Sequence, residues 1–532
     1  MMIETKTHYE KNEYFLDSPV NVYFEELLEM TPTQFEDWVV DMRKTVVDIW
    51  DTHGIPPRRG KNEEGIVAQF NKMCSYPVHE FTHTDELSDV EDDVIINKSR
   101  LGAEADQWFP TMYKTRINYT EKDNGYSIYD LFANDKYKER MTKGCFRHFR
   151  RDSMYIHALT CFKNKKKPAL IECDDAAEYI RTFHDYKERI FKGYDFMLEQ
   201  VKVREGMNTG YYQVDQSDIL QLTKEQVVSL KHDGLLEYRH HSTFDINDMP
   251  DDMVYSIRLY KKGERMFPKG FPAFRIGYIQ PAVNFPPMTA KYLYERFTED
   301  IKDQERIIIY DPSSGWGGRI LGAMSCRDDR NIHYVGTDPN TDNHHSDDGG
   351  SRYADLANFY NTKTYRGNPF FSETNSYEIF GDGSEEIQWN PNFRKYKGEL
   401  DLVFTSPPYF NREAYSEDET QSFKRYGTSY ESWRDGFLKP TLETCYNWLK
   451  DDRYMLWNIA DIKIGKNYLP LEQDSINILE ELGMKYLYTL KMGLEGMPGQ
   501  NRLDEDGKPK CKNFCKVNGE YLKFEPVLVF KK

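Results

Sequence analysis

The tetrapeptide Ser406, Pro407, Pro408 and Tyr409 holds the side chains with the clearest chemical potential in this chain. It follows the apolar run 402–404, whose β-propensity predicts a buried strand that two prolines must end. Adjacent prolines fix a rigid turn that presents carbonyl groups and has no N–H donors of its own. Carbonyl and hydroxyl oxygens can accept the hydrogens of an exocyclic amine, while the tyrosine ring stacks on the attached base. The turn is therefore suited to holding the amino group of a base.

The first element that could position this turn lies upstream and ends in Asp311. A β-branched run over 306–311 predicts a strand, a turn with Gly315 and Gly317 follows, and residues 319–324 begin like a helix. A strand, a glycine-rich turn and a helix in this order open the nucleotide-binding α/β folds, in which ligands lie at the carboxyl ends of the strands. The sequence therefore predicts a ligand site near Asp311.

Two more acids follow in the same manner. Asp338 ends the expected strand 332–338, and an acid at that place can accept both ribose hydroxyls of a nucleoside. Asp382 ends a third expected strand over 377–382 and could accept a hydrogen bond from an adenine amino group. Any one of these acids could simply close a turn, and Ser-Pro-Pro-Tyr also occurs in ordinary turns. The ordered series of strand-end acids and then the proline turn favours a nucleoside site.

With these motifs in order, the sequence resembles the S-adenosylmethionine-dependent DNA amino-methyltransferases, which modify cytosine at N4 or adenine at N6. Residues 311–317 are similar to the family's Asp-Pro-Phe-x-Gly-x-Gly cofactor loop, with serine where phenylalanine is usual. The resemblance implies that residues 406–409 are the catalytic motif. It also implies S-adenosylmethionine as the cofactor, with contacts from Asp311, Ser313, Gly315, Gly317, Asp338 and Asp382.

The resemblance extends to both ends of residues 276–532. Residues 284–297 are similar to the family's entry helix, which closes over the methionine part of the cofactor, so that Phe285 and Pro286 join the implied cofactor contacts. Residues 524–532 resemble its last strand. The expected fold of this half is an α/β, Rossmann-like methyltransferase sheet, with further strands at 454–461 and 485–492.

The length of 532 residues exceeds a usual single core and predicts two or three domains. We expect a methyltransferase domain over 276–532 and a mixed α+β target-recognition or accessory region over 1–275. That region can divide into two modules, 1–125 and 126–275. Patterns for helices occur at 31–50, which opens with a capping box, and at 63–73.

The charge pattern bears on the expected partner, DNA. A net charge of −17 opposes phosphate binding on average, but the acids concentrate in 85–93 and 245–252. Basic residues interleaved with aromatic ones suit a surface that contacts a nucleic-acid backbone, although a solvated face over a core has the same pattern. The most basic stretch covers residues 136–167, and its predicted phosphate contacts are Arg147, Arg150, Arg151, Lys165, Lys166 and Lys167.

Hydropathy and cysteine usage indicate the cellular compartment. No apolar run approaches the roughly 18 residues that span a bilayer, and the amino terminus lacks the basic-then-apolar form of a secretory signal. The eight cysteines are scattered, and Cys511 and Cys515 have no second pair beside them for zinc. We therefore expect a cytoplasmic protein with reduced thiols, no metal site and no membrane partner. The oligomeric state and a partner nuclease cannot be inferred.

The implied reaction moves a methyl group from the cofactor's sulfonium to an exocyclic amino nitrogen. Hydrogen bonds from the amine to the Ser406 side chain and the Pro407 carbonyl would localise its lone pair, and Tyr409 with Phe410 would stack on a flipped base. The polar segment 411–427 would be a mobile loop that closes over the base.

Two questions stay open. Serine at the first motif position is commoner in cytosine-N4 enzymes and aspartate in adenine-N6 enzymes, so cytosine is favoured and adenine is the alternative. RNA and protein-amide methyltransferases share the cofactor loop and a Pro-Pro-Tyr turn, and a DNA-binding module without activity could keep the fold.

Overall fold

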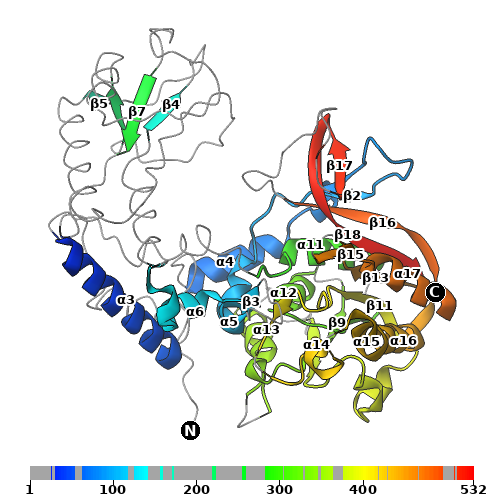
Figure 1. Cartoon of the computed structure of the whole chain (residues 1–532). Helices are drawn as coiled ribbons and strands as arrows, with labels where there is room; N and C mark the ends of the chain where they lie inside the picture. Colours follow the sequence, from blue (N-terminus) through cyan, green and yellow to red (C-terminus); the bar gives the residue numbers. More distant parts are fainter. Residues whose placement is uncertain are drawn as a thin grey trace. The chain divides into compact units, whose positions relative to one another are not determined.

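The computed structural model divides the chain into two compact units (Figure 1). One comprises residues 1–9, 55–128 and 281–532, and the other comprises residues 10–54 and 129–280. Apart from a few isolated positions and the backbone of four short strands between residues 156 and 258, the structure describes residues 30–53, 63–117, 125–139, 282–302, 305–326, 330–345, 349–363, 375–416, 418–427, 429–464, 467–494 and 512–532.

The first unit is built on a ten-stranded sheet with the strand order β1-β2-β16-β18-β13-β11-β8-β9-β10 and β17 beside β18. Neighbouring strands from β10 to β13 are parallel, whereas β18 runs antiparallel to β13 and β16. The strands are β1 Thr82–His83, β2 Val94–Ile95, β8 Ile307–Asp311, β9 Ile332–Thr337, β10 Ser376–Phe380, β11 Leu400–Thr405, β13 Leu449–Asn458, β16 Lys485–Gly493, β17 Phe514–Val517 and β18 Glu520–Lys531.

This order places β8 between β9 and β11, so the chain winds away from β8 in both directions. Such a reversal is the topological switch point of doubly wound sheets, where ligands bind outside the carboxyl ends of the strands. The predicted Rossmann-like α/β sheet is confirmed, and the strands expected near 306–311, 332–338, 377–382, 402–404, 454–461, 485–492 and 524–532 are all present.

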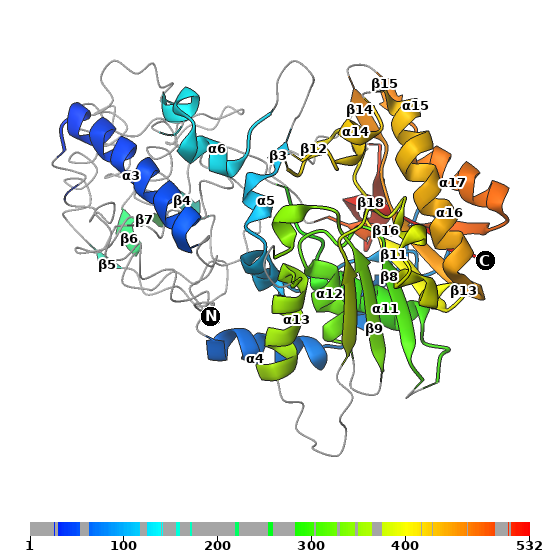
Figure 2. The same cartoon turned by 90° about the horizontal axis from the view of Figure 1, so that it is seen from below.

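Helices cover both faces of the sheet, which is why every residue of β11 is buried. Figure 2 shows one group nearer to β9 and a second group nearer to β13. The first group is α11 Pro287–Phe297, α12 Gly318–Met324 and α13 Arg352–Lys363, and the second is α15 Tyr430–Trp433, α16 Lys439–Trp448 and α17 Leu471–Leu482.

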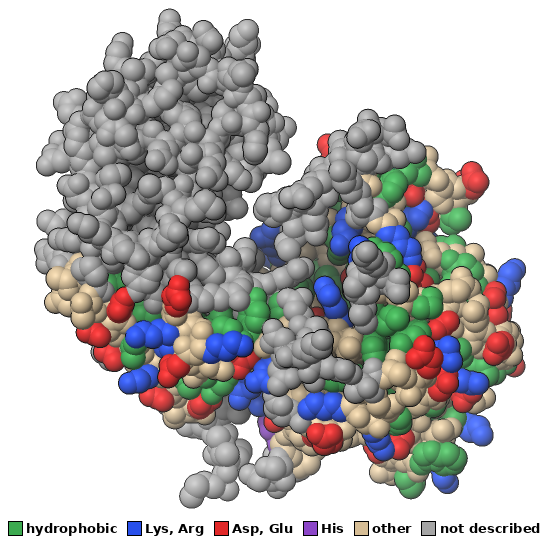
Figure 3. Space-filling view, in the orientation of Figure 1, with side chains coloured by type: hydrophobic (Ala, Val, Ile, Leu, Met, Phe, Trp, Pro, Cys, Tyr) green, Lys and Arg blue, Asp and Glu red, His purple; other side chains and the backbone are tan. Residues whose placement is uncertain are grey.

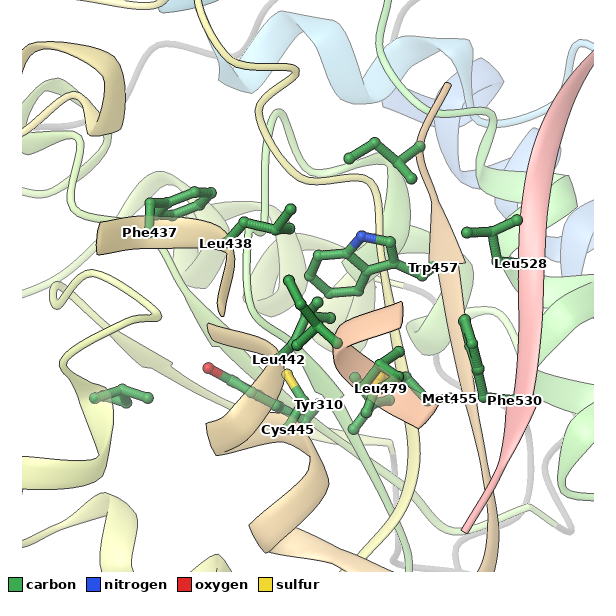
Figure 4. Packing of buried hydrophobic residues seen from close by; sticks show 14 of the residues in the cluster. Tyr310, Phe437, Leu438, Leu442, Cys445, Met455, Trp457, Leu479, Leu528 and Phe530 are labelled. Atoms are coloured by element: carbon green, nitrogen blue, oxygen red, sulfur yellow. The ribbon is translucent and has the colours of Figure 1, made fainter. Parts of the chain in front are cut away.

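The core between the sheet and the second helix group is strongly apolar (Figure 4). Leu442 and Cys445 lie one turn apart on α16, so both face the sheet, and both are fully buried. They share the core with Trp457 of β13 and Phe530 of β18. This packing fixes the carboxyl ends of β11 and β13 in place.

Residues 63–117 belong to the same unit as the sheet, whereas the boundary between residues 280 and 281 lies close to the expected position near residue 276. The ring of Phe70, in α4 Glu63–Cys74, stacks on Tyr360 of α13 with centroids 4.5 Å apart. β2 extends the sheet by pairing with β16. The physical reason is that this segment buries its apolar side chains against α13 and the sheet edge.

The second unit contains α3 Pro32–His53, whose buried stripe includes Phe35, Val39, Met42 and Val46. Its predicted capping box is present, because Thr31 N–H donates to Gln34 Oε1 at 2.8 Å and Gln34 N–H donates to Thr31 Oγ1 at 3.3 Å. A four-stranded sheet has the order β4-β7-β6-β5 (Ile156–Leu159, Val254–Arg258, Ile219–Leu222, Ile171–Glu172). None of the helices in the described ranges combines the length and apolar character that crossing a bilayer requires.

Two buried acids of the acidic stretch 85–93 pair with a lysine of the sheet. Lys491 of β16 donates to Asp85 at 2.7 Å and to Asp93 at 2.6 Å, and both carboxylates are buried. Although burial alone would raise it, the hydrogen bonds from Lys491, from Lys516 and from Leu87 hold the pKa of Asp85 below its ordinary value. This cluster therefore stabilises the fold above the ordinary aspartate pKa, and its contribution is lost as pH falls through the folded pKa.

Replacing Lys491 by methionine is expected to destabilise the protein by about 3 kcal/mol, because it leaves two buried carboxylates without their cation. Urea unfolding at pH 7 measures this change. Lys512→Met is the matched control, since Lys512 bonds Asp461 at 2.5 Å but its side chain is 50% exposed. It should cost less than about 1 kcal/mol. Equal losses in the two variants would contradict the role assigned to the buried cluster.

Candidate active site

Asp311, at the carboxyl end of β8, is a fully buried carboxylate that joins neighbouring strands. Thr405 at the end of β11 donates to its Oδ1 at 2.6 Å, while Arg319 Nε and the Tyr334 hydroxyl each donate to its Oδ2 at 2.6 Å. Its side chain is 0% exposed. The expected direct contact between Asp311 and a cofactor is therefore corrected: protein donors cover this carboxylate, which orders the strand ends beneath the loop.

The glycine-rich loop that follows β8 is closely covered on two sides. Gly315 and Gly317 have φ angles of +63° and +77°, which favour glycine. A β-carbon on Gly317 would lie 2.4 Å from Cε2 of Phe109, and one on Gly318 would lie 2.1 Å from the Phe285 carbonyl oxygen. Ser313 and Gly315 remain partly exposed. The exposed side of the loop is thus limited to its first half.

Asp338, directly after β9, is tied to the same loop through Tyr353 of α13. The Tyr353 hydroxyl lies 2.5 Å from the Gly315 carbonyl oxygen and within hydrogen-bond distance of the Asp338 carboxylate, and it can donate its proton to either. Asn343 donates to Asp338 Oδ2 at 2.6 Å and accepts from Thr111 at 2.8 Å. Burial raises the pKa of Asp338, and the hydrogen bonds from Tyr353 and Asn343 partly offset that rise. The structure brings the loop and this half-buried acid together, as the sequence predicted.

Asp382 lies after β10, the next strand along the same edge. β10 reaches the neighbouring strand end, since the Asp338 amide donates to the Phe380 carbonyl oxygen at 3.0 Å. Asp382 is half-buried and accepts from Asn390 at 2.7 Å. The ends of β8, β9 and β10 therefore present one continuous row of polar groups.

The proline turn follows β11 on the other side of β8. Pro407 is buried, and Ser406, Pro408 and Tyr409 are half-buried. The Tyr409 hydroxyl donates to Glu525 Oε1 at 2.7 Å or to the Asn458 carbonyl oxygen at 3.1 Å. Because β8 and β11 are adjacent, this turn and the glycine-rich loop flank the switch point of the sheet.

Phe410 corrects one prediction. Its side chain is 3% exposed, and its ring packs 5.7 Å from that of Trp433 and 6.0 Å from that of Tyr430. Its φ of +51° turns the chain sharply after Tyr409. The ring of Phe410 is part of the hydrophobic core, so this ring cannot stack on a nucleic-acid base.

The segment 411–427, expected to be a mobile loop, contains regular structure. β12 Glu413–Ala414 pairs with β3 Arg116–Ile117, and α14 Ser422–Arg425 follows. The Tyr415 ring lies 5.6 Å from that of Trp316 in the glycine-rich loop, and its hydroxyl donates to Glu413 at 2.8 Å. This segment therefore connects the two sides of the candidate site.

The entry segment also contacts the loop. Asn284 donates to the Trp316 carbonyl oxygen at 2.7 Å and to Asp106 at 3.1 Å. The Phe285 ring is buried against Phe404, with centroids 5.2 Å apart, and Pro286 caps α11. The Phe285 backbone thus lies beside the end of the loop, whereas its ring belongs to the core, and the cofactor contacts of Phe285 and Pro286 stay a prediction.

Sequence analysis missed several side chains that shape the site. They come from segments distant in sequence, and only the topology brings them to the strand ends: Phe109, Asn284, Asn343, Tyr353, Tyr415 and Glu525. The predicted phosphate contacts at Arg147, Arg150, Arg151 and Lys165, Lys166 and Lys167 lie outside the described residues.

No family model matches the sequence. No curated protein matches it either. Among solved structures, the chain has 18% identity to TTHA0409 of Thermus thermophilus, described as a "Putative DNA Modification Methylase" and complexed with S-adenosyl-L-methionine. The match covers 28% of this chain and 52% of that one, with a TM-score of 0.18. This chain thus spans about half the length of that protein.

Two further matches are also methyltransferases. A TehB-like S-adenosylmethionine-dependent methyltransferase from Corynebacterium glutamicum is 14% identical over 47% of this chain and 89% of that one, with a TM-score of 0.22. The CurJ carbon methyltransferase is 12% identical over 46% of this chain and 53% of that one, with a TM-score of 0.27.

Replacing Gly317 by alanine is expected to destabilise the protein because it adds a clash with Phe109 to an unfavourable φ. Gly398→Ala is the matched control, since Gly398 has a φ of +72° and nothing within 4 Å of an added β-carbon. The control should lose about 1–2 kcal/mol from backbone strain alone, and Gly317→Ala about 1–3 kcal/mol more. Urea unfolding measures both. Identical losses would show that Phe109 does not cover the loop tightly.

Proposed function

We propose that this protein is an S-adenosylmethionine-dependent methyltransferase that acts on an exocyclic amino group of DNA, with cytosine N4 favoured. One observation carries the proposal: the Ser-Pro-Pro-Tyr turn follows β11 immediately beside the glycine-rich loop that follows β8. At that switch point a cofactor on one side and an amine on the other would meet.

The cofactor assignment depends on the strand-end acids. Asp338 has an acceptor group beside the glycine-rich loop, where the ribose hydroxyls of an adenosyl group would lie. Asp382 lies one strand further along, where an adenine amino group would follow its ribose. The half-exposed Ser313 and Gly315 supply the part of the loop that a ligand can reach. Together these groups fit a nucleoside-bearing cofactor such as S-adenosylmethionine.

The proline turn supplies the groups that would hold the amino group that receives the methyl group. The amine lone pair is delocalised into the base, so acceptors on Ser406 and on the Pro407 carbonyl would draw its hydrogens away and localise that pair. Placing the nitrogen in line with the methyl group can lower the barrier by about 7–11 kcal/mol at best. The route needs no covalent intermediate.

The substrate class is the finer part of the proposal. DNA is favoured by the Ser-Pro-Pro-Tyr type of the motif and by the basic and aromatic residues of the amino-terminal half. On the described surface in Figure 3, acidic and basic side chains are interspersed. Incubation with tritiated S-adenosylmethionine and unmethylated DNA, RNA or bulk protein tests the proposal. Label in DNA supports it, and label in RNA or protein alone would overturn the DNA assignment.

Neutralising the basic stretch should weaken DNA binding and reduce its salt dependence. If Arg147, Arg150 and Arg151 contact phosphates, the triple glutamine variant should lower the slope of log affinity against log salt by about one unit per contact. Fluorescence anisotropy on a labelled duplex at several salt concentrations measures the slope. An unchanged slope would assign these arginines to a solvated face.

A further inference from the structure

The Ser-Pro-Pro-Tyr motif has no carboxylate, which raises the question of where a proton goes. Methyl transfer to an amino group forms a new N–C bond, breaks the S–C bond and leaves the nitrogen with a positive charge and one proton too many. Serine can accept a hydrogen bond from that nitrogen but is a very weak base. A basic group must therefore be reached through the serine or through water.

Tyr409 connects the serine to a carboxylate. Ser406, three residues earlier in the same turn, lies close enough to the Tyr409 hydroxyl to lower its pKa, which partly offsets the rise that burial causes. The same hydroxyl lies 2.7 Å from Glu525 Oε1 and 3.1 Å from the Asn458 carbonyl oxygen. Glu525 is in β18, more than one hundred residues along the chain from the motif, and the antiparallel pairing of β18 with β13 and β16 brings it here.

We propose that Ser406, Tyr409 and Glu525 form a proton relay that carries the released proton away from the methylated amine. The proposal depends on the proposed function. The amine proton passes to Ser406 Oγ, the serine proton to the Tyr409 oxygen, and the tyrosine proton to Glu525 Oε1. Each oxygen keeps its bond count, and Glu525 ends as the neutral acid, which solvent later deprotonates.

The hydrogen bonds around Tyr409 suit both ends of this transfer. When Glu525 is ionised, the Tyr409 hydroxyl donates to it. When Glu525 is protonated, it can donate to Tyr409, whose hydroxyl then donates to the Asn458 carbonyl oxygen. Glu525 and the Tyr409 hydroxyl therefore each keep a hydrogen-bond partner in both states.

The surroundings of Glu525 make its ionised carboxylate a stronger proton acceptor than that of an ordinary glutamate. Burial raises its pKa, and the hydrogen bond from Tyr409 and the charge of Lys523 partly offset that rise. Glu413, also buried with a raised pKa, is the other carboxylate close enough to interact with it. The ionised form accepts the proton, so transfer should decline as pH falls through this raised pKa.

Glu525→Gln and Tyr409→Phe test the relay, because both keep the shape of the site and remove the proton path. Single-turnover transfer from tritiated S-adenosylmethionine to unmethylated DNA is measured between pH 5 and 9. Both variants should lose roughly a hundredfold in rate at pH 8. The decline of the transfer rate at low pH, the acid limb of the parental pH profile, should be absent in Glu525→Gln and present in Glu413→Gln. Glu520→Gln, exposed at the start of β18, serves as the inert control.

The outcomes separate the relay from the proposed function. A parental chain that labels neither DNA, RNA nor protein overturns both. If the parental chain is active and both Glu525→Gln and Tyr409→Phe transfer methyl groups at the parental rate, the relay alone is overturned. The same holds if the rate of Glu525→Gln declines at low pH as the parental rate does. Cofactor titration and thermal midpoints check that each variant is folded, and Tyr409→Phe decides the matter if Glu525→Gln does not fold.

Discussion

Ser406→Ala is expected to lower methyl transfer at least about a hundredfold while cofactor affinity and the thermal midpoint stay at parental values. Ser406 is half-buried at the end of β11, next to strand residues that are all buried. Its hydroxyl contributes little to the core, so its loss should not unfold the turn. The Ser406 oxygen accepts a hydrogen bond from the amine, and this bond is strongest in the transition state, where the amine loses its planar geometry. The loss of a bond made mainly in the transition state lowers turnover more than substrate binding.

Ser406→Asp provides the matched comparison. Aspartate is the commoner first residue of this motif in the adenine-N6 enzymes that the sequence resembles. The variant restores an acceptor, so it should recover part of the transfer lost in Ser406→Ala. Labelled transfer under single-turnover conditions measures both variants. A parental rate in Ser406→Ala would remove the serine from the chemistry, whereas loss of folding would assign it to the structure of the turn.

Asp338→Ala should weaken S-adenosylmethionine binding by at least about tenfold, a loss of roughly 1.4 kcal/mol. The change removes the acceptor expected for the ribose hydroxyls. It also takes a partner from Tyr353 and Asn343, which hold the glycine-rich loop and α13 around the site. Calorimetric titration measures the dissociation constant.

Asp342→Ala is the control for this experiment. Asp342 is exposed in the same connection between β9 and α13, so the variant removes an equal charge without touching the strand end. Its affinity should be parental. Because burial raises the pKa of Asp338, parental affinity should also fall at mildly acidic pH, as the ionised acceptor is lost. Unchanged affinity in Asp338→Ala would remove the nucleoside pocket.

The sheet could be predicted from the sequence because its signals are local. Each parallel strand is a short β-branched or apolar run closed by an acid, a glycine or a proline, and the order of these runs selects the doubly wound topology. Asp338, Asp382 and Ser406 all lie at the predicted strand ends. Their arrangement followed from one rule, that carboxyl ends of parallel strands share an edge.

The misassigned residues show what local signals leave out. Asp311 occupies a motif position, yet its three side-chain donors come from α12, β9 and β11, and burial makes it an organiser of the strand ends. Phe410 follows the motif directly, but its positive φ turns the ring into the core. Neither outcome is visible without the packing.

The amino-terminal half was least predictable. Phe70 contacts α13, Phe109 contacts the glycine-rich loop, and β2 pairs with β16. Residues 63–117 therefore complete the unit of the sheet through contacts that span about two hundred to four hundred positions. Glu525 joins the proline turn in the same non-local way. Pairings of this kind have no sequence period, so the sequence did not assign residues 63–117 to the unit that contains the sheet.

The most direct test of amino-group methylation is nucleoside mass spectrometry on DNA from cells that express the parental chain or Ser406→Ala. The predicted result is N4-methylcytosine in DNA exposed to the parental protein and none above background with the variant. If N6-methyladenine is found instead, the assigned reaction type is retained and the target base is adenine. Equal methylation by both chains, or DNA without any amino-methylated base from cells with active parental protein, would contradict the proposed function.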